Sequence, residues 1–281
     1  MPTVLPTLFV SHGAPTLVVE PVPTRDFLRQ LGGLLPRPKA ILAVSAHWDT
    51  PEPRISSGPS PHTMYDFYGF PDALYEMTYP APGSPALAGR AASLLAKAGL
   101  PATLDAQRGL DHGAWVPLML MHPQAEVPVV QLSISSHLPP EHHLALGRAL
   151  APLREEGVLI LASGNATHNL RDVFRHDLLE QPAPYAKAFA DWLTARVEQG
   201  EVGPVLRSLD DGPEAARNHP TADHFLPLLV ALGAGLGAGH EMAAADRQAR
   251  LLHNGYTYGV LSMAAYAWGG ASALTGTGPR P

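Results

Sequence analysis

Histidine is the residue type in this chain whose number and placement could support chemistry. The sequence contains 14 histidines and no cysteine, so any metal site must be built from imidazoles and carboxylates. Four apolar runs each break into small polar residues and then reach a histidine: Leu8 to His12, Ile41 to His47, Val129 to His137 and Leu159 to His168. Imidazole binds divalent metals and titrates near neutral pH, so these positions indicate metal ligands or general bases.

Two of these histidines have closely similar surroundings. Ser11-His12-Gly13 and Ser45-Ala46-His47 repeat one pattern at the ends of two runs. A single histidine at a strand end is more often a hydrogen-bonded structural residue, but the repetition favours His12 and His47 as metal ligands. Together with His224 they fit a site with three protein ligands and one open position. Ligands on separate elements are less diagnostic than a local motif, and a structural role stays open for each.

Two further histidines stand in turns. Leu110 to Trp115 is typical of a strand-to-helix turn that places His112 beside the sheet edge, or of a plain helix start capped by Asp111. The turn from Ser163 to His168 contains a glycine and could place His168 as a general base, or it could be an ordinary loop. Both readings remain open at each turn.

The elements that would position these histidines form an α/β pattern. Apolar runs of this kind suit strands buried on both faces, and helices are predicted between them over Thr24 to Leu35, Ser84 to Ala98, Glu141 to Leu153 and Pro184 to Glu198. This alternation predicts a single α/β domain with a mostly parallel central sheet flanked by helices. Ligands of such sheets bind beyond the carboxyl ends of the strands, and the histidines fall at that edge.

The last third of the chain is less regular. Gly200 to Pro213 is expected to be a surface excursion, and an apolar helix is expected to open at His219-Pro220-Thr221 and to stop at Gly233. His224 would then lie near the start of that helix. Tyr256 to Ala267 is predicted to be a last strand.

Composition limits the classes of partner. Hydrophobic residues make up 46% of the 281 residues and charged residues 16%, which is enough apolar material for a core. A net charge of -6 without a basic cluster argues against nucleic acid and membrane partners. The first residues lack the pattern of a signal peptide, so a cytoplasmic location is expected. No heptad or isolated apolar face indicates an oligomeric state.

Six motifs taken together resemble a known family. They are Ser11-His12-Gly13-Ala14-Pro15, Ser45-Ala46-His47-Trp48, Tyr65-Asp66-Phe67-Tyr68-Gly69-Phe70-Pro71, Leu110-Asp111-His112-Gly113-Ala114-Trp115-Val116-Pro117-Leu118, Gly164-Asn165 with His168-Asn169-Leu170, and His219-Pro220-Thr221 with His224-Phe225-Leu226-Pro227-Leu228. In this order, between residues 3 and 270, they resemble the 4,5-DOPA extradiol dioxygenase family. That family belongs to the class III ring-opening dioxygenases, whose type member is the catalytic subunit of protocatechuate 4,5-dioxygenase.

The resemblance implies roles for particular residues. His12, His47 and His224 would bind the metal, and His168 would be the acid/base residue, either near the metal or as an additional ligand. His112 would be a second active-site histidine. Where class III relatives present two histidines and a glutamate, His224 stands at the matching position, with Asp223 as an alternative. Fe(II) is implied for activity, and Zn(II) is expected to fit the same ligands in the purified protein.

The implied reaction is the opening of a DOPA-like catechol by O2, with residues 1–281 as one catalytic domain. The aromatic segment from Met64 to Pro71, extended to Tyr75 and Tyr79, would either cap a core or line a pocket for a flat ligand. Candidate substrate contacts are Tyr65, Phe67, His62 and Thr221.

Two other functions remain open from the residues alone. One is a zinc-dependent hydrolase in which His168 acts as the base for a metal-bound water. The other is a non-catalytic binding protein on the same fold, against which the presence of both His112 and His168 argues.

Overall fold

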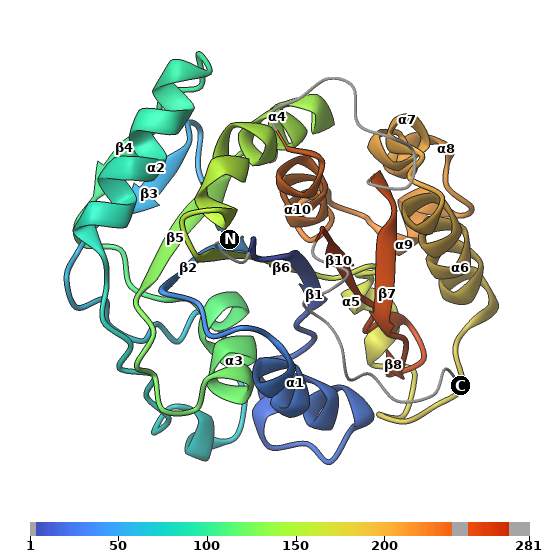
Figure 1. The fold of residues 1–281 in the computed structure, drawn as a ribbon. Coiled ribbons are helices and arrows are strands. Elements are labelled where there is room, and N and C mark those ends of the chain that lie inside the picture. The colour runs from blue at the N-terminus through green and yellow to red at the C-terminus, as the bar shows by residue number, and fades with distance from the viewer. Residues whose placement is uncertain (1–3, 238–246, 270–281) are drawn as a thin grey trace.

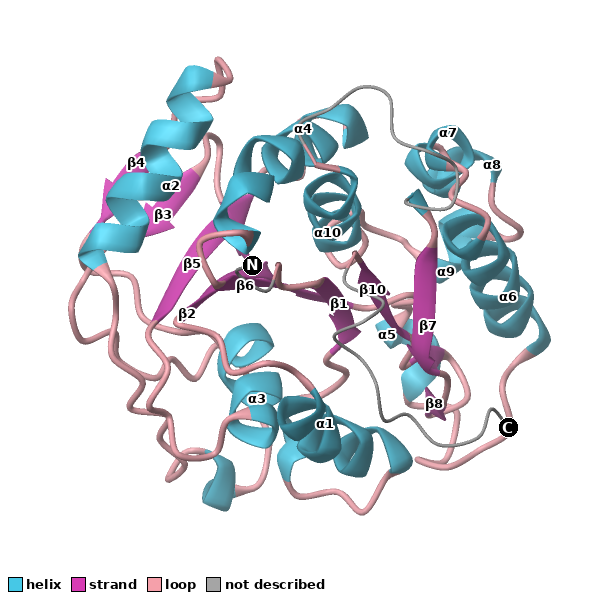
Figure 2. Ribbon diagram, in the orientation of Figure 1, coloured by secondary structure: helices cyan, strands magenta, loops and turns pink. Residues whose placement is uncertain are grey.

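A central sheet organises the structure, which is a computed structural model that describes residues 4–237 and 247–269. The described residues form an eight-stranded sheet in the order β4-β3-β5-β2-β6-β1-β10-β7 (Figures 1 and 2). Its strands are β1 (Thr7–Ser11), β2 (Ala40–Asp49), β3 (Arg54–Ser56), β4 (Thr103–Asp105), β5 (Val129–Ile134), β6 (Val158–Gly164), β7 (Ala249–His253) and β10 (Ala265–Trp268). A separate two-stranded sheet pairs β8 (Tyr256–Thr257) with β9 (Leu261–Ser262).

The middle of the large sheet is parallel, as the sequence predicts. Strands β5, β2, β6 and β1 are neighbours and run in one direction. The register pairs Ser11 with Gly164 and Ser45 with Ser163, so the ends of β1 and β6 and the last part of β2 lie at one edge. That register brings the histidine-bearing ends of three strands together.

Helices cover both faces of the sheet. The α-helices of the described residues are α1 (Pro23–Leu34), α2 (Pro85–Lys97), α3 (His112–Met121), α4 (Pro140–Leu150), α5 (Leu170–Val173), α6 (Pro184–Glu198), α7 (Val202–Leu206), α8 (Ser208–Asp211), α9 (Ala215–Asn218) and α10 (Leu226–Leu236). Helices α1 and α3 pack on one face, and α2, α4 and α10 on the other (Figure 1). Among the described residues, no helix combines the length and the apolar character that crossing a membrane requires.

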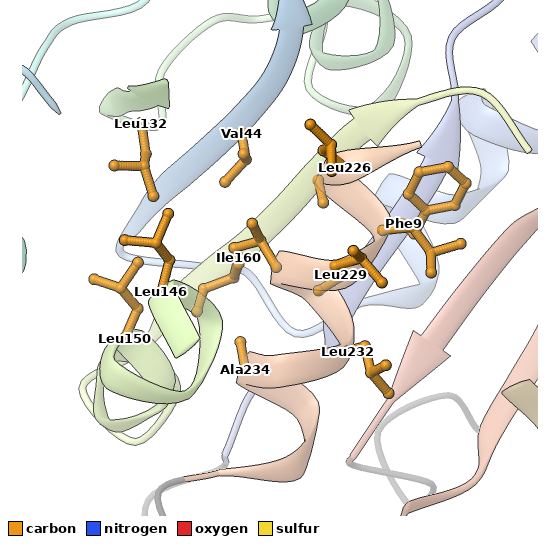
Figure 3. Close-up of a cluster of buried hydrophobic side chains, with 14 of the residues drawn as sticks. Phe9, Val44, Leu132, Leu146, Leu150, Ile160, Leu226, Leu229, Leu232 and Ala234 are labelled. Atoms are coloured by element: carbon orange, nitrogen blue, oxygen red, sulfur yellow. The ribbon is translucent and has the colours of Figure 1, made fainter. Parts of the chain in front are cut away.

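The strands are buried on both faces because their side chains alternate between two apolar clusters. Val44 and Ile160 face the cluster that includes α10, whereas Ile41 and Leu159 face the cluster that includes α1 and α3. Figure 3 shows the side chains of Leu226, Leu229 and Leu232 from α10, together with Leu146 and Leu150 from α4, gathered around this first face. Near-continuous apolar strands are therefore what this layered arrangement requires.

Local signals located several helices correctly. Helix α2 begins at Pro85, and the Ser84 hydroxyl accepts a hydrogen bond from the amide of Leu87 at 3.2 Å. Gly99, after the end of that helix, has a φ of +75°. Helix α6 occupies the predicted range from Pro184 to Glu198.

Gly200 to Pro213 lies mostly at the surface, as expected, and it is largely helical: it contains α7 and α8, which pack through the buried side chain of Val205. The expected bounds of the apolar helix that follows were wrong. The apolar helix begins only at Leu226 and continues past Gly233 to Leu236. A Cβ on Gly233 would lie 2.1 Å from the carbonyl oxygen of Leu144, so this glycine allows α10 to approach α4 closely and does not end the helix.

The predicted strand from Tyr256 to Ala267 is also wrong as a single element. The chain forms β8, β9 and β10 there, because Tyr258 and Gly259 take φ values of +54° and +59° and turn the chain back on itself. Only β10 joins the large sheet, where it runs antiparallel to β1.

His143 on α4 predicts an acid-sensitive contribution to stability. Its buried Nε2 accepts a hydrogen bond from the amide of Ser135 at 3.2 Å, which requires the neutral ring. Burial, followed by the charge of His142, lowers the pKa of His143 to about 4 from its ordinary 6.5. Because the unfolded chain takes up the proton more readily, this stability is full above about pH 6.5 and is lost as the pH falls toward 4. The loss corresponds to about 3 kcal/mol.

The matched variants are His143→Gln and His62→Gln, since His62 is exposed. His143→Gln is expected to flatten the pH dependence of the free energy of unfolding over this interval, whereas His62→Gln retains the wild-type slope. Urea unfolding measured at several pH values checks this, and equal slopes in the two variants would contradict it.

Candidate active site

Three imidazoles converge at the edge of the sheet where the parallel strands end. His12 follows β1, His47 lies near the end of β2, and His224 lies between α9 and α10. The Nε2 atom of His47 is 3.0 Å from Nε2 of His12 and 3.2 Å from Nε2 of His224. The ligand atoms of the three side chains all lie within 4.8 Å of one another.

The other ring nitrogen of each histidine faces an oxygen atom. Nδ1 of His12 is 2.9 Å from Ser163 Oγ, Nδ1 of His47 is 3.5 Å from Asp66 Oδ2, and Nδ1 of His224 is 2.5 Å from Asp223 Oδ2. A proton on each Nδ1 leaves the lone pairs of three neighbouring Nε2 atoms available to one cation. Such an arrangement fits a divalent cation, which is bound by neutral imidazole nitrogen.

Burial keeps these rings in the form that binds metal. Desolvation, followed by the charges of neighbouring histidines, lowers the pKa of His12 and of His224 well below the ordinary value. Desolvation also lowers the pKa of His47 to about 4, and the nearby His112 adds to this effect. All three rings are therefore neutral near pH 7, and metal binding there displaces no proton from them.

The turn after β6 holds two of the three histidines. The amide of His12 donates to the carbonyl of Gly164 at 3.0 Å, and the amide of Asn165 donates to the carbonyl of His224 at 2.9 Å. A Cβ on Gly164 would lie 2.1 Å from the His224 carbonyl oxygen, so glycine is required for this approach. The glycine in the predicted turn thus brings a distant segment to the end of β1.

A buried carboxylate joins β2 to the start of α3. Asp111 Oδ1 accepts hydrogen bonds from Ser45 Oγ at 2.6 Å and from the amide of Ala114 at 3.2 Å, which makes it the helix N-cap. Its Oδ2 accepts from Arg108 at 2.6 Å and from Gln131 at 2.8 Å. The capped helix start and the active-site turn, the two readings of this segment, are therefore one and the same structure.

His112 and His168 flank the three-histidine group on different sides. The ring of His112 lies against that of His47, with centroids 3.8 Å apart. The ring of His168 is stacked on that of His224, with centroids 3.4 Å apart and an angle of 7° between the planes. Burial lowers the pKa of His168 to about 4, although the charge of Asp223 opposes this.

A cavity of about 600 Å³ opens above these rings. Five histidines contribute to its lining, namely His47, His112, His168, His176 and His224. Much of the rest is apolar, including Phe67, Phe70, Leu170, Val173, Phe174, Tyr258 and Leu261. The cavity can therefore hold a flat aromatic ligand against the imidazoles.

The four candidate substrate contacts lie in different places. Among the described residues that line the cavity, Phe67 is present and the other three candidates are not. Tyr65 donates its hydroxyl to the carbonyl of Met77 at 2.8 Å and packs edge-on against Phe67. His62 and Thr221 are exposed side chains. The aromatic segment both caps a core and lines a pocket, because Phe67 belongs to the buried cluster and to the cavity wall.

Several residues of the site carry no signal in the sequence that singles them out. Asp66 was hidden within the aromatic segment, and Ser163 within a run of small residues. Phe174 comes from the turn after α5 and Leu261 from the short strand β9, and the positions of both depend on the whole fold. What identifies Asp66 and Ser163 is that an oxygen atom of each side chain lies next to a histidine ring. That proximity exists only in the folded structure.

Comparison with known proteins decides the family. The family described as the catalytic LigB subunit of aromatic ring-opening dioxygenase matches residues 7–260. The chain belongs to this family. LigB membership makes it an oxidoreductase that cleaves aromatic rings by metal-dependent extradiol chemistry. Of the three functions considered from the residues, the dioxygenase is the one that the family supports.

Individual relatives of this LigB-family chain agree. The 4,5-DOPA dioxygenase extradiol of Beta vulgaris is 43% identical over 264 residues, which cover 92% of this chain and 95% of the relative. The protein of the same name from Escherichia coli (strain K12) is 47% identical over 237 residues, covering 83% of this chain and 86% of the relative. The crystal structure of an uncharacterized protein from Escherichia coli K12 superposes with a TM-score of 0.75 at 38% identity, covering 94% of this chain and 100% of the other.

Proposed function

We propose that this LigB-family chain opens the ring of a DOPA-like catechol with O2, at one metal ion held by His12, His47 and His224. The observation that carries the proposal is the convergence of three Nε2 atoms beside an apolar cavity of about 600 Å³. Relatives named for 4,5-DOPA support the substrate class. Residues 1–281 would act as a single catalytic domain, and a cytoplasmic location stays a prediction.

The metal that we propose for activity is Fe(II). When bound, Fe(II) supplies a redox-active centre that couples an electron-rich catechol to dioxygen, which Zn(II) on the same three imidazoles does not. Neutral nitrogen ligands fit either ion, so the purified protein is expected to contain zinc as well as iron.

His168 is proposed as the base that accepts the proton of a catechol hydroxyl. Its ring is neutral at pH 7, because its pKa is about 4, and it lies at the cavity wall. It stacks face to face on His224 and stands outside the group of three whose ligand atoms lie within 4.8 Å. A parallel stack aims the ring nitrogens past the neighbouring ring, so this geometry favours substrate over metal as the partner of His168.

His112 is proposed as the residue that stabilises the oxygen side of the reaction. Its Nδ1 is 3.0 Å from Asp66 Oδ2, which leaves Nε2 as the nitrogen that can hydrogen-bond to a bound reactant. Its position beside His47, with His168 beside His224, puts one imidazole on each of two sides of the proposed metal position. His168 can then accept a proton on one side of the bound catechol, and His112 can donate one on another side.

The apolar wall would orient the aromatic ring. Phe67 and Leu261 are buried side chains of the cavity lining, and Phe174 lies at its exposed rim. Stacking and apolar contact with such side chains hold a flat ring without competing for its hydroxyl groups. The hydroxyls are then left to the imidazoles.

Anaerobic reconstitution with Fe(II), followed by assay in air, tests the proposal. L-DOPA is expected to be turned over with uptake of one O2 per ring opened and formation of a yellow ring-opened product, with caffeate and protocatechuate as comparison substrates. Protein loaded with Zn(II) is the control and is expected to give no ring cleavage. Absence of turnover on every catechol with the Fe(II)-loaded protein would contradict the proposed function.

A further inference from the structure

One carboxylate, that of Asp66, contacts two of the active-site histidines at once. Its Oδ2 is 3.0 Å from Nδ1 of His112 and 3.5 Å from Nδ1 of His47. Its Oδ1 accepts a hydrogen bond from the backbone amide of His112 at 2.9 Å. Asp66 therefore forms hydrogen bonds with the backbone amide and the ring of His112 and lies close to the ring of His47, and the two rings have different proposed roles.

These contacts determine where the protons of the two rings reside. A carboxylate accepts hydrogen bonds and does not donate them, so Nδ1 of His112 carries hydrogen. At 3.5 Å the negative charge of Asp66 favours hydrogen on Nδ1 of His47 as well. The Nε2 atom of His47 is then free to bind the metal, and the Nε2 atom of His112 is free to face the cavity. Carboxylates that bind the far nitrogen of a metal-ligating histidine fix its orientation in this way.

Asp66 is itself held firmly, although it lies in a loop. The amide of Met64 donates to the carbonyl of Leu110 at 2.8 Å, and Trp115 Nε1 donates to the carbonyl of Met64 at 2.9 Å. These bonds fasten the loop to the start of α3, whose first amide, that of His112, donates to Asp66. A negative charge at this position also interacts favourably with the helix N-terminus.

We propose that Asp66 is a positioning residue that sets ring orientation and proton location in His47 and His112 together. Metal affinity, through His47, and the chemical step, through His112, would then depend on one side chain. The second half rests on the proposed function, whereas the first half concerns metal binding alone.

Asp66→Asn keeps the shape of the side chain but removes its negative charge and one of its two acceptor oxygens. An amide offers one oxygen and one NH2 group, so Asp66→Asn can serve the His112 amide or the Nδ1 atoms but not both. Where its NH2 faces Nδ1 of a histidine, that ring must place its proton on Nε2. In this form His47 cannot bind the metal through Nε2. Asp66→Glu keeps the carboxylate, and Asp72→Asn is the matched control because Asp72 is an exposed carboxylate in the same segment.

The experiment is a titration of the metal-free proteins with Zn²⁺ against a chromogenic chelator, followed by kinetics on L-DOPA at saturating Fe(II). Asp66→Asn is expected to weaken Zn²⁺ binding by about 10- to 100-fold and to lower kcat by a similar factor, with KM changed by less than about threefold. Asp66→Glu is expected to bind Zn²⁺ more tightly than Asp66→Asn, and Asp72→Asn to match the wild type.

Two results would overturn the proposal. One is a Zn²⁺ affinity of Asp66→Asn within about threefold of the wild type. The other is an equal loss in Asp66→Asn and Asp66→Glu, which would show that side-chain shape, and not the carboxylate, is what matters. If the wild-type protein opens no catechol, the proposed function fails, but the Zn²⁺ titrations still decide the role of Asp66 at His47.

Discussion

Replacing His47 with alanine is expected to empty the metal centre and to lower ring-cleavage activity by roughly a thousandfold or more. His47 has the central position in the group, because its Nε2 lies 3.0 Å from Nε2 of His12 and 3.2 Å from Nε2 of His224. Its removal leaves only two of the three imidazole ligands. Metal analysis of freshly purified protein and Zn²⁺ titration measure the loss.

The matched control for this prediction is His137→Ala, which removes an exposed imidazole at the end of a different strand. It is expected to retain stoichiometric metal and full activity. Thermal unfolding of both variants in the metal-free state shows whether the fold is intact. Stoichiometric metal in His47→Ala would remove His47 from the ligand set.

Replacing His168 with glutamine is expected to lower kcat on a catechol by about 100- to 10,000-fold while leaving the bound metal in place. Glutamine keeps a planar amide against the ring of His224, on which His168 stacks at 3.4 Å, so the packing is largely preserved. What disappears is a neutral base at the cavity wall. The two readouts are steady-state kinetics with Fe(II) and metal content.

This pair of readouts separates the two roles considered for His168. If His168 is a base, its replacement lowers turnover but not the metal content. Added imidazole is then expected to restore part of the activity of His168→Ala. If His168 is a metal ligand, its replacement lowers the metal content as well. Loss of metal from His168→Gln at the wild-type protein concentration would therefore contradict the base and support the additional ligand.

The sequence predicts the sheet and the edge at which the site forms because those features are written in local patterns. Apolar runs such as Ile41 to Ser45 identify buried strands, and the polar break before His12 or His47 identifies the strand end. The sequence does not reveal that His224 joins them, since that segment is neither a strand end nor the start of α10. Family resemblance, and not periodicity, supplied that residue.

Other features depend on contacts between distant segments, which no local pattern encodes. Asp66 reaches His112 across 46 positions of sequence. Gly233 looks like a helix stop in a linear sequence, but in the fold it is the point where α10 touches α4. Turn residues such as Tyr258 lie inside an apolar stretch that favours one long strand, so the break there becomes visible only in three dimensions.

The three imidazoles come from the end of the first strand, the second strand and the approach to α10, and the first and last of them are more than two hundred residues apart along the chain. A metal ion bound to all three therefore acts as a cross-link between the two ends of the domain. Because the unfolded chain lacks the assembled ligands, each increment of metal occupancy adds to the free energy of unfolding. Resistance to heat and to proteases then reports how much metal the cell has supplied, independently of whether any substrate is present.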